Sequence, residues 1–254
     1  MSGKEWRYHC SGNGPHALLC LSGSLGASEG TASLISELLP GARIVMPEYT
    51  PVETMAEVLA GLDHIVKEEG LQSVTVYGGS FGGLIAQCWA RLHPERVTHL
   101  ILSGTAPPDP SRVSGNQKAL RRLPCVPMVA IRFLLRMTLR ILLRKAKLPR
   151  WKEEYLQLIS RLTKDDLASR YQIAMDLDSN YKYTSLDLPP CMRILILEGD
   201  RDRVAHTAVR DQLRALYPHA QTHVFRGAGH SAMMTHTKEW SDAVMEFLDF
   251  REQS

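Results

Sequence analysis

A serine lies among four glycines where a strand-like run meets a helical pattern. Residues 76–85 read VYGGSFGGLI, and Gly78, Ser80 and Gly82 fit the pattern G-x-S-x-G. Glycine weakens strands and helices alike, so local propensity does not explain this cluster. In a nucleophile elbow the chain turns sharply from strand to helix, small neighbours let the two elements approach, and the serine Oγ projects outward. The pattern therefore predicts Ser80 as a nucleophile.

The same glycines would also suit a tight turn of the kind that binds nucleotides. Neither G-x-G-x-x-G nor a Walker lysine accompanies them. The run SVTVY precedes the cluster and LIAQCWARL follows it, which places the serine at a strand-to-helix junction. This position favours the elbow.

A serine hydroxyl needs a base to take its proton and a carboxylate to orient that base. With an elbow serine, the chain order is serine, acid, histidine. EGDRDRV follows the strand-like run MRILIL, and GAGHSA follows a later run. We therefore expect Asp202 and His230 to lie past two strand ends, at the same sheet edge as Ser80. His230 is the only one of ten histidines in a glycine-flanked loop directly after a strand.

Two other aspartates compete for the acid position. Asp200 belongs to the same motif as Asp202, and Asp109 follows an earlier strand. We favour Asp202 because of its position in the motif. A carboxylate at this point would otherwise serve the N-terminus of the next helix.

The oxyanion hole is expected to combine two backbone N–H groups. One belongs to Phe81, the residue after the nucleophile, and the other to the loop after an early strand. The loop in LLCLSGSLGAS supplies it, with Ser24 as the expected donor and Leu25 as the alternative. An ordinary strand-to-helix turn would also use Gly23 and Gly26, so this loop alone is only weak evidence for an oxyanion hole.

Short apolar runs alternate with helical patterns along the chain, which predicts a doubly wound, mostly parallel α/β sheet with helices on both faces. The expected strands are Trp6–Cys10, Ala17–Leu21, Ala42–Met46, Ser73–Tyr77, Val97–Leu102, Met192–Leu197 and Thr222–Phe225. The expected helices are Ala32–Leu39, Val52–Glu69, Phe81–Leu92, Thr207–Leu216 and Thr237–Phe250. A length of 254 residues suits one large domain of this class.

The alternation breaks between residues 107 and 187. This stretch carries helix signals without a convincing strand, and prolines mark both of its edges. We expect residues 107–187 to form a helical cap inserted into a core made of residues 1–106 and 188–254. Ligand crevices of open α/β sheets lie at the carboxyl edge of the strands, where such a cap would cover them.

The motifs GGSFGG, GDRD and GAGH, in this order, resemble the α/β-hydrolase superfamily over nearly the whole chain. Within it, the chain looks most similar to the maspardin-type branch, through LSGSLGASEG, YGGSFGGLIAQ, LASRYQIAMDLDSNY and LYPHAQTH. Members usually have His-Gly where this chain has Ser22-Gly23, so the oxyanion loop is expected to differ. Maspardin is regarded as an interaction protein, whereas His230 completes a triad here. Ser80 argues against dehalogenases and epoxide hydrolases, which use an aspartate nucleophile.

These residues predict a serine esterase that cleaves a small or acyl-chain ester with the triad Ser80, Asp202 and His230. Water completes the reaction, so no metal or organic cofactor is expected. A non-catalytic binding or adaptor protein on the same fold is the competing interpretation. Thioester and C–C bond cleavage use the same machinery and stay open.

Twelve basic residues and no acidic residue lie from residue 112 to residue 152. They are Arg112, Lys118, Arg121, Arg122, Arg132, Arg136, Arg140, Arg144, Lys145, Lys147, Arg150 and Lys152. The rest of the chain holds the other 18 of the 30 Lys and Arg residues and all 27 Asp and Glu residues. Four arginines recur every four residues and predict a cationic stripe on one helix, whose apolar positions FLL, MTL and ILL are expected to form cap core. These are Arg132, Arg136, Arg140 and Arg144.

Two interpretations of this charge stay open. The stripe either packs on the acidic remainder or faces solvent with its stems over apolar surface. Alternatively, it is a basic amphipathic surface for anionic lipid or an acidic substrate. The second would suit a lipid esterase, or a thioesterase that receives a phosphate-bearing acyl carrier. No motif for nucleic acid accompanies the charge.

The five cysteines are scattered, odd in number and without a CxxC pair. This usage argues against a disulfide framework and a zinc site and favours a reducing compartment. The start MSGKEWRYHC is too polar for a signal peptide, and no run reaches the roughly 18 apolar residues that span a bilayer. We expect a cytoplasmic protein.

Overall fold

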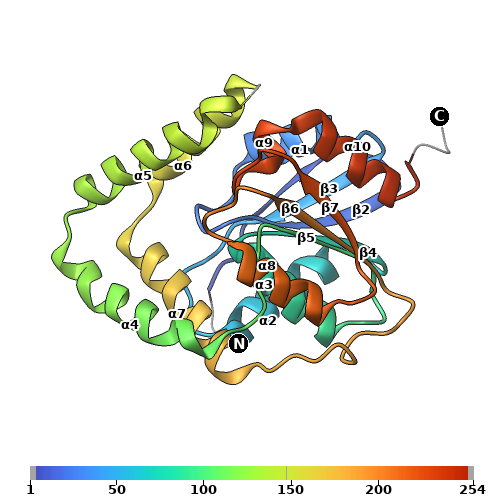
Figure 1. Cartoon of the computed structure of the whole chain (residues 1–254), viewed down its shortest axis with the longest axis horizontal. Helices are drawn as coiled ribbons and strands as arrows, with labels where there is room; N and C mark the ends of the chain where they lie inside the picture. The colour runs from blue at the N-terminus through green and yellow to red at the C-terminus, as the bar shows by residue number, and fades with distance from the viewer. Residues whose placement is uncertain (1–3, 147, 251–254) are drawn as a thin grey trace.

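The computed structural model of the chain describes residues 4–146 and 148–250. Its strands form one sheet in the order β1-β3-β2-β4-β5-β6-β7, with β1 antiparallel to β3 and the other neighbours parallel (Figure 1). The strands are β1 (Tyr8–Ser11), β2 (His16–Leu21), β3 (Ala42–Pro47), β4 (Val74–Gly79), β5 (Val97–Ser103), β6 (Arg193–Gly199) and β7 (Gln221–Phe225). Each lies within two residues of its expected bounds, so the predicted fold class is confirmed.

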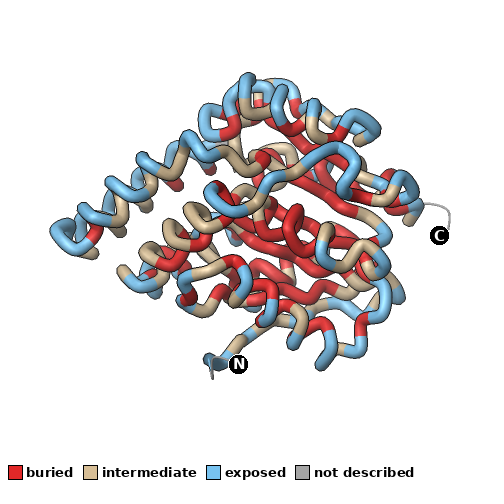
Figure 2. The backbone as a smooth tube through the Cα atoms, turned by 90° about the horizontal axis from the view of Figure 1, so that it is seen from below, coloured by how far each residue is buried: buried red, intermediate tan, exposed pale blue. Residues whose placement is uncertain are grey.

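The central strands are apolar on both sides because helices cover both faces of the sheet. Successive side chains alternate: Val76 and Leu100 pack into one helix layer, and Tyr77 and Ile101 into the other. Helices α2, α3 and α8 form the first layer, and α1 and α10 the second, so buried residues concentrate between them (Figure 2). Their bounds are α1 (Glu29–Leu38), α2 (Met55–Glu68), α3 (Phe81–Leu92), α8 (Thr207–Leu216) and α10 (Thr237–Phe247).

Between β5 and β6 the chain makes four helices that reach beyond the sheet (Figure 1). They are α4 (Val113–Arg122), α5 (Met128–Leu142), α6 (Pro149–Arg161) and α7 (Lys164–Asn180). We call residues 107–187 the inserted segment. Its buried side chains join both layers of the core: Ile173 and Leu177 lie in the layer of α2 and α3, and Trp151 and Ile159 in that of α1.

The expectation that the apolar positions of α5 form cap core is wrong for most of them. Phe133, Leu134 and Ile141 are 65%, 66% and 71% exposed, and Leu139 is the one buried residue of this helix. The reason is that α5 packs along the side that faces α6 and the cavity beside Ser80. The regular spacing shows which residues share one face of the helix. It does not show whether another element covers that face.

The four-arginine stripe is also less regular than expected. Arg132 turns inward, and its guanidinium donates a 2.9 Å hydrogen bond to the carbonyl of Leu162. Arg136, Arg140 and Arg144 face solvent, so they are not docked on the acidic part of the molecule. Lys147 and the side chain of Lys145 lie outside the described residues.

Within residues 4–146 and 148–250, no helix has the length and apolar character needed to cross a bilayer. The same residues contain no group of three or more His, Cys, Asp or Glu side chains placed to hold a metal ion. The five cysteines all fall inside this range and are free thiols, two of them buried.

Candidate active site

The chain turns from β4 into α3 at Ser80, and the backbone there is strained. Ser80 has φ 51° and ψ −117°, a conformation that residues other than glycine rarely adopt. A Cβ at Gly82 would overlap the carbonyl oxygen of Leu21, and one at Gly78 would lie 2.6 Å from the Cα of Gly83. The glycines are therefore required by the close approach of β2, β4 and α3, which holds the serine hydroxyl above the carboxyl end of the sheet.

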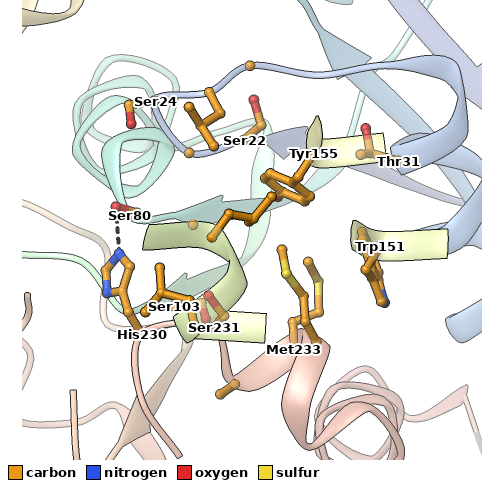
Figure 3. Close-up of a pocket in the computed structure, with 18 of the residues that line it drawn as sticks. Ser22, Ser24, Thr31, Ser80, Ser103, Trp151, Tyr155, His230, Ser231 and Met233 are labelled. Carbon is orange, nitrogen blue, oxygen red and sulfur yellow. Dashed lines mark hydrogen bonds between the residues drawn. The ribbon is translucent and has the colours of Figure 1, made fainter. Parts of the chain in front are cut away.

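The imidazole of His230 joins Ser80 to Asp202. Its Nε2 lies 2.9 Å from the Ser80 Oγ (Figure 3), and its Nδ1 lies 2.8 Å from Asp202 Oδ2. The three residues follow β4, β6 and β7, whose parallel course brings their ends to one edge of the sheet. Gly104, after β5, lies against the ring, where a Cβ would be 3.3 Å from Nδ1. The structure thus brings together the three residues expected from the sequence.

The Asp202 carboxylate is buried and fully engaged. Its Oδ1 accepts hydrogen bonds from the N–H groups of Val204 and Ala205, at 2.8 and 3.0 Å. Burial acts to raise the pKa of the Asp202 carboxyl. The hydrogen bond and the charge of His230 act in the opposite direction, as do the two amides, and the pKa of this carboxyl lies below its ordinary value. An ionised carboxylate accepts from Nδ1–H, so it favours the tautomer whose Nε2 accepts the serine proton.

The other two aspartates lie apart from the imidazole and have their own partners. Asp200 Oδ1 accepts a 2.7 Å hydrogen bond from the N–H of Gly227. Asp109 accepts from the N–H of Ser111 at 2.9 Å and caps the short helix that follows. Of the three carboxylates that the sequence left open, Asp202 is the one that the structure places against the imidazole.

Two candidate oxyanion donors lie beside Ser80. The Phe81 N–H is the first of α3, and such N–H groups have no partner within their own helix. Ser24 and Leu25 form the centre of a turn closed by a 3.0 Å hydrogen bond from the Gly26 N–H to the Gly23 carbonyl. A Cβ at Gly23 would lie 3.7 Å from the Ser80 Cβ, so this turn adjoins the nucleophile (Figure 3).

Tyr49, which the sequence analysis did not select, holds this turn in place. Its hydroxyl donates a 2.8 Å hydrogen bond to the carbonyl of Ser22, and burial raises its pKa. Its ring meets that of Phe81 edge to face at 5.4 Å, and the Arg170 guanidinium lies 4.9 Å from the ring centre. The available signal was a polar aromatic residue two positions after the end of β3, at the same sheet edge as Ser80.

An apolar cavity of about 240 Å³ opens beside the Ser80 hydroxyl (Figure 3). Its walls come from the turn after β2, from β4, from α5 and α6, and from the short helix α9 (Ala232–Thr235) that follows β7. They include Leu25, Tyr77, Leu139, Trp151, Tyr155 and Met233. Burial raises the pKa of the Tyr155 hydroxyl to about 12, as expected in apolar surroundings.

A second cavity, of about 540 Å³, also borders Ser80, and its walls include charged side chains. It includes Asn116 and Gln212, together with the ion pair between Arg112 and Asp178. The Asp178 carboxylate is buried and also accepts a 3.0 Å hydrogen bond from the N–H of Asp109. Ser80 therefore borders two cavities, and only the second has Arg and Asp side chains in its walls.

Comparison with known proteins identifies hydrolases. A model of the Alpha/beta hydrolase family matches residues 9–243. A 2-hydroxymuconate semialdehyde hydrolase of Pseudomonas putida is 26% identical over 223 residues, which cover 79% of this chain and 70% of that protein. A 2-hydroxy-6-oxononadienedioate/2-hydroxy-6-oxononatrienedioate hydrolase of Cupriavidus pinatubonensis is also 26% identical, with 96% of this chain and 91% of that protein covered.

Solved structures share the fold at lower sequence identity. A carboxylesterase structure of Nitrososphaera gargenis superimposes with a TM-score of 0.74 at 18% identity, covering 96% of this chain and 94% of that one. An esterase of Exiguobacterium antarcticum gives a TM-score of 0.74 at 16% identity, with 96% and 95% covered. At this identity the likeness shows a common fold.

Proposed function

Because the chain belongs to the alpha/beta hydrolase family, we propose that it is a serine hydrolase that cleaves carboxylic esters through an acyl-enzyme intermediate. The observation that carries this proposal is the position of the His230 imidazole. It lies 2.9 Å from the Ser80 hydroxyl and 2.8 Å from the Asp202 carboxylate. An imidazole between these two groups can remove the hydroxyl proton, which a serine nucleophile requires.

In the first half-reaction, the Ser80 Oγ attacks the ester carbonyl carbon while the His230 Nε2 takes the hydroxyl proton. The carbonyl π electrons move to its oxygen and form a tetrahedral oxyanion. When the C=O bond re-forms, the bond to the alcohol oxygen breaks, and His230 returns the proton to this leaving oxygen. The products are a free alcohol and an acyl group esterified to Ser80.

In the second half-reaction, a water molecule attacks the acyl-enzyme carbonyl and gives a proton to the His230 Nε2. Collapse of the second tetrahedral intermediate breaks the bond to Oγ and returns this proton to Ser80. The carboxylic acid leaves, and the enzyme regains its starting state. Asp202 stabilises the imidazolium that forms in both halves, and its lowered carboxyl pKa keeps it ionised for this role.

The N–H groups of Phe81 and Ser24 are the proposed oxyanion donors, with Leu25 as the alternative to Ser24. Each such donor is typically worth about 3 kcal/mol in the transition state. The first belongs to the start of α3 and the second to the turn after β2, and both segments adjoin Ser80. The carbonyl oxygen of the substrate would point between them.

Two cavities border Ser80, and an ion pair lies in the wall of the second, which supports a substrate with one apolar and one polar side. We assign the acyl chain to the apolar cavity of about 240 Å³, whose walls include Leu139, Trp151 and Met233. The alcohol side would leave through the second cavity, beside the pair Arg112–Asp178. This arrangement favours a short or medium acyl chain over an acetyl group.

A fluorophosphonate probe tests the triad directly, because it reacts with a serine only when a base activates the hydroxyl. We expect covalent labelling of the Ser80 peptide in the wild-type protein, no labelling of Ser80→Ala and much weaker labelling of His230→Ala. Ser33→Ala is a matched control, since Ser33 hydrogen bonds only to Glu37 on α1. Absence of labelling in folded wild-type protein would favour the non-catalytic binding or adaptor function.

A series of p-nitrophenyl esters tests the acyl assignment. Each methylene buried in the cavity is worth about 0.8 kcal/mol, so we expect kcat/KM to rise about fourfold per carbon from acetate until the cavity is full. A flat or falling series would reject the acyl assignment while leaving the triad intact. The matching thioesters, measured in parallel, distinguish an esterase from a thioesterase.

A further inference from the structure

The outward face of α5 combines exposed apolar side chains with unpaired arginines, and we infer that it binds the surface of an anionic lipid bilayer. We call this face the α5 patch. It consists of Val129, Phe133, Met137, Ile141, Arg136 and Arg140 of α5, and of Arg144 in the helical turn Leu143–Lys145 that directly follows this helix. This inference concerns where the protein docks and goes beyond the reaction proposed for Ser80.

The apolar members of the α5 patch form one stripe along the helix. They recur every fourth residue, and this spacing places side chains on one face of a helix. Val129 is 78% exposed, Phe133 65% and Ile141 71%. No other helix in residues 4–146 and 148–250 exposes so many large apolar side chains. Large apolar groups gathered on one surface mark an interaction site.

The arginines form a second stripe next to the first. Arg136, Arg140 and Arg144 also recur every fourth residue and are exposed. Within the described part of the chain, the structure has no ion pair to any of the three. Other basic residues of the inserted segment do find acidic partners: Arg112 pairs with Asp178, and Arg150 with Glu37. The α5 patch therefore keeps its positive charge available.

An anionic bilayer matches both stripes at once. Its acyl region accepts the apolar side chains, and its headgroups attract the guanidinium groups, whose long stems reach from the helix to the interface. A second copy of this chain would place arginines against arginines, because residues 112–152 contain no acid. The same repulsion argues against a dimer through this face.

The opposite side of α5 adjoins the proposed active site. Leu135, Leu139 and Leu142 line the apolar cavity beside Ser80. The helix thus separates the surface that would contact the bilayer from the compartment assigned to the acyl chain. A protein bound through the α5 patch would hold this cavity close to the headgroup level.

Vesicle flotation tests the inference with the full chain. We expect binding to vesicles of 70% phosphatidylcholine and 30% phosphatidylglycerol at low salt, little binding to pure phosphatidylcholine, and loss of binding at high salt. Each arginine near a charged surface contributes about fivefold in binding, so Arg136→Glu with Arg140→Glu and Arg144→Glu should weaken it at least 100-fold. Ser80→Ala should bind as the wild type does, which separates this test from that of the proposed function.

A matched variant controls for net charge. Lys67→Glu with Lys182→Glu and Arg226→Glu changes the charge by the same amount on other, exposed parts of the molecule, and it should keep most of the binding. Equal loss in both triple variants would overturn the inference, as would wild-type protein that does not prefer anionic vesicles. The second result would point to an acidic protein partner instead.

Quenching by brominated lipid acyl chains tests the orientation. Phe133→Trp places a reporter in the α5 patch, and we expect vesicles with brominated chains to quench its added fluorescence. Val224→Trp places a reporter at an exposed position of β7, where no quenching is expected. Equal quenching of the two reporters, or quenching of Val224→Trp alone, would overturn the assignment of α5 as the docking face.

Discussion

Two aspartates follow β6 within three residues, and they make different contacts. Asp202 Oδ2 lies 2.8 Å from the His230 Nδ1, whereas Asp200 accepts a hydrogen bond from the N–H of Gly227. We expect Asp202→Asn to lower kcat about 10⁴-fold with little change in KM, because the amide favours the wrong imidazole tautomer. Steady-state kinetics on a p-nitrophenyl ester measures this effect.

Asp200→Asn is the matched control, since an amide oxygen can still accept from the Gly227 N–H. It should keep kcat within about threefold of wild type, as expected for an exposed position outside the triad. A comparable loss in both variants would contradict the assignment of the acid to Asp202. The sequence placed both residues at the correct sheet edge, but only side-chain packing determines which one faces the imidazole.

Tyr49 acts on the proposed oxyanion hole through the backbone. Its hydroxyl holds the Ser22 carbonyl, two residues before Ser24. We expect Tyr49→Phe to lower kcat about tenfold while KM stays nearly constant, because a displaced N–H weakens transition-state binding more than substrate binding. Steady-state kinetics and urea unfolding should be measured on the same preparation.

Tyr8→Phe provides the comparison. The Tyr8 hydroxyl donates a 2.6 Å hydrogen bond to Glu69 near the far edge of the sheet. Loss of this hydrogen bond should lower the free energy of unfolding by about 0.5–1.5 kcal/mol, as in Tyr49→Phe, without changing kcat. If Tyr49→Phe alters stability but not kcat, then Tyr49 has a structural role only.

At the scale of elements, the junction of β4 and α3 depends on missing side chains. A Cβ at Gly82 would overlap the carbonyl oxygens of Leu21 and Ser22, which belong to the backbone and have little freedom to move. We expect Gly82→Ala to lower the free energy of unfolding by about 3 kcal/mol and to reduce labelling of Ser80. Urea unfolding followed by circular dichroism gives the first value.

Gly115→Ala, within α4, is the control with the opposite sign. A Cβ there meets no atom within 4 Å, so alanine should stabilise the protein by up to about 1 kcal/mol through its higher helix propensity. If both substitutions had the same small effect, then close packing would not be the reason for the glycine at position 82.

The sequence predicted the elements of the core well and those of the inserted segment less well. Strands such as β4 and β6 are continuous apolar runs, and the bounds of α3 and α8 agree with the prediction. In α5, by contrast, the pattern of FLL and ILL was interpreted as core, and Phe133 and Ile141 are exposed. An amphipathic pattern indicates a shared face, and whether that face is covered depends on contacts distant in sequence.

At the scale of the whole molecule, the cavities beside Ser80 are also a feature that the sequence pattern does not predict. The meeting of Ser80, Asp202 and His230 could be predicted because strand ends of a parallel sheet meet at one edge. The cavity wall could not, because Trp151 and Met233 reach it from α6 and α9. Their meeting depends on how the inserted segment packs, which neither periodicity nor motif spacing encodes. The resemblance to the maspardin-type branch stays a prediction.

The inserted segment is tied to the core at several points. The hydroxyl of Ser28 at the start of α1 donates a 2.8 Å hydrogen bond to Glu154 of α6. Asp176 of α7 accepts from the N–H of Met55 at the start of α2 at 2.8 Å. Trp151 and Ile159 of α6, and Ile173 and Leu177 of α7, also belong to the clusters that cover the two faces of the sheet. If the inserted segment unfolded alone, all these contacts with the core would be lost, so its separate unfolding is disfavoured.

We therefore expect the core and the inserted segment to unfold in one transition. Trp151 lies in α6 and Trp89 in α3, and both are fully buried. In a variant that keeps Trp151 alone, with phenylalanine at the other three tryptophan positions, the fluorescence midpoint in urea should coincide with the circular dichroism midpoint. A variant that keeps only Trp89 is the control and should show the same coincidence. A Trp151 transition at lower urea than the dichroism transition would show instead that the inserted segment unfolds first, as an independent cap would.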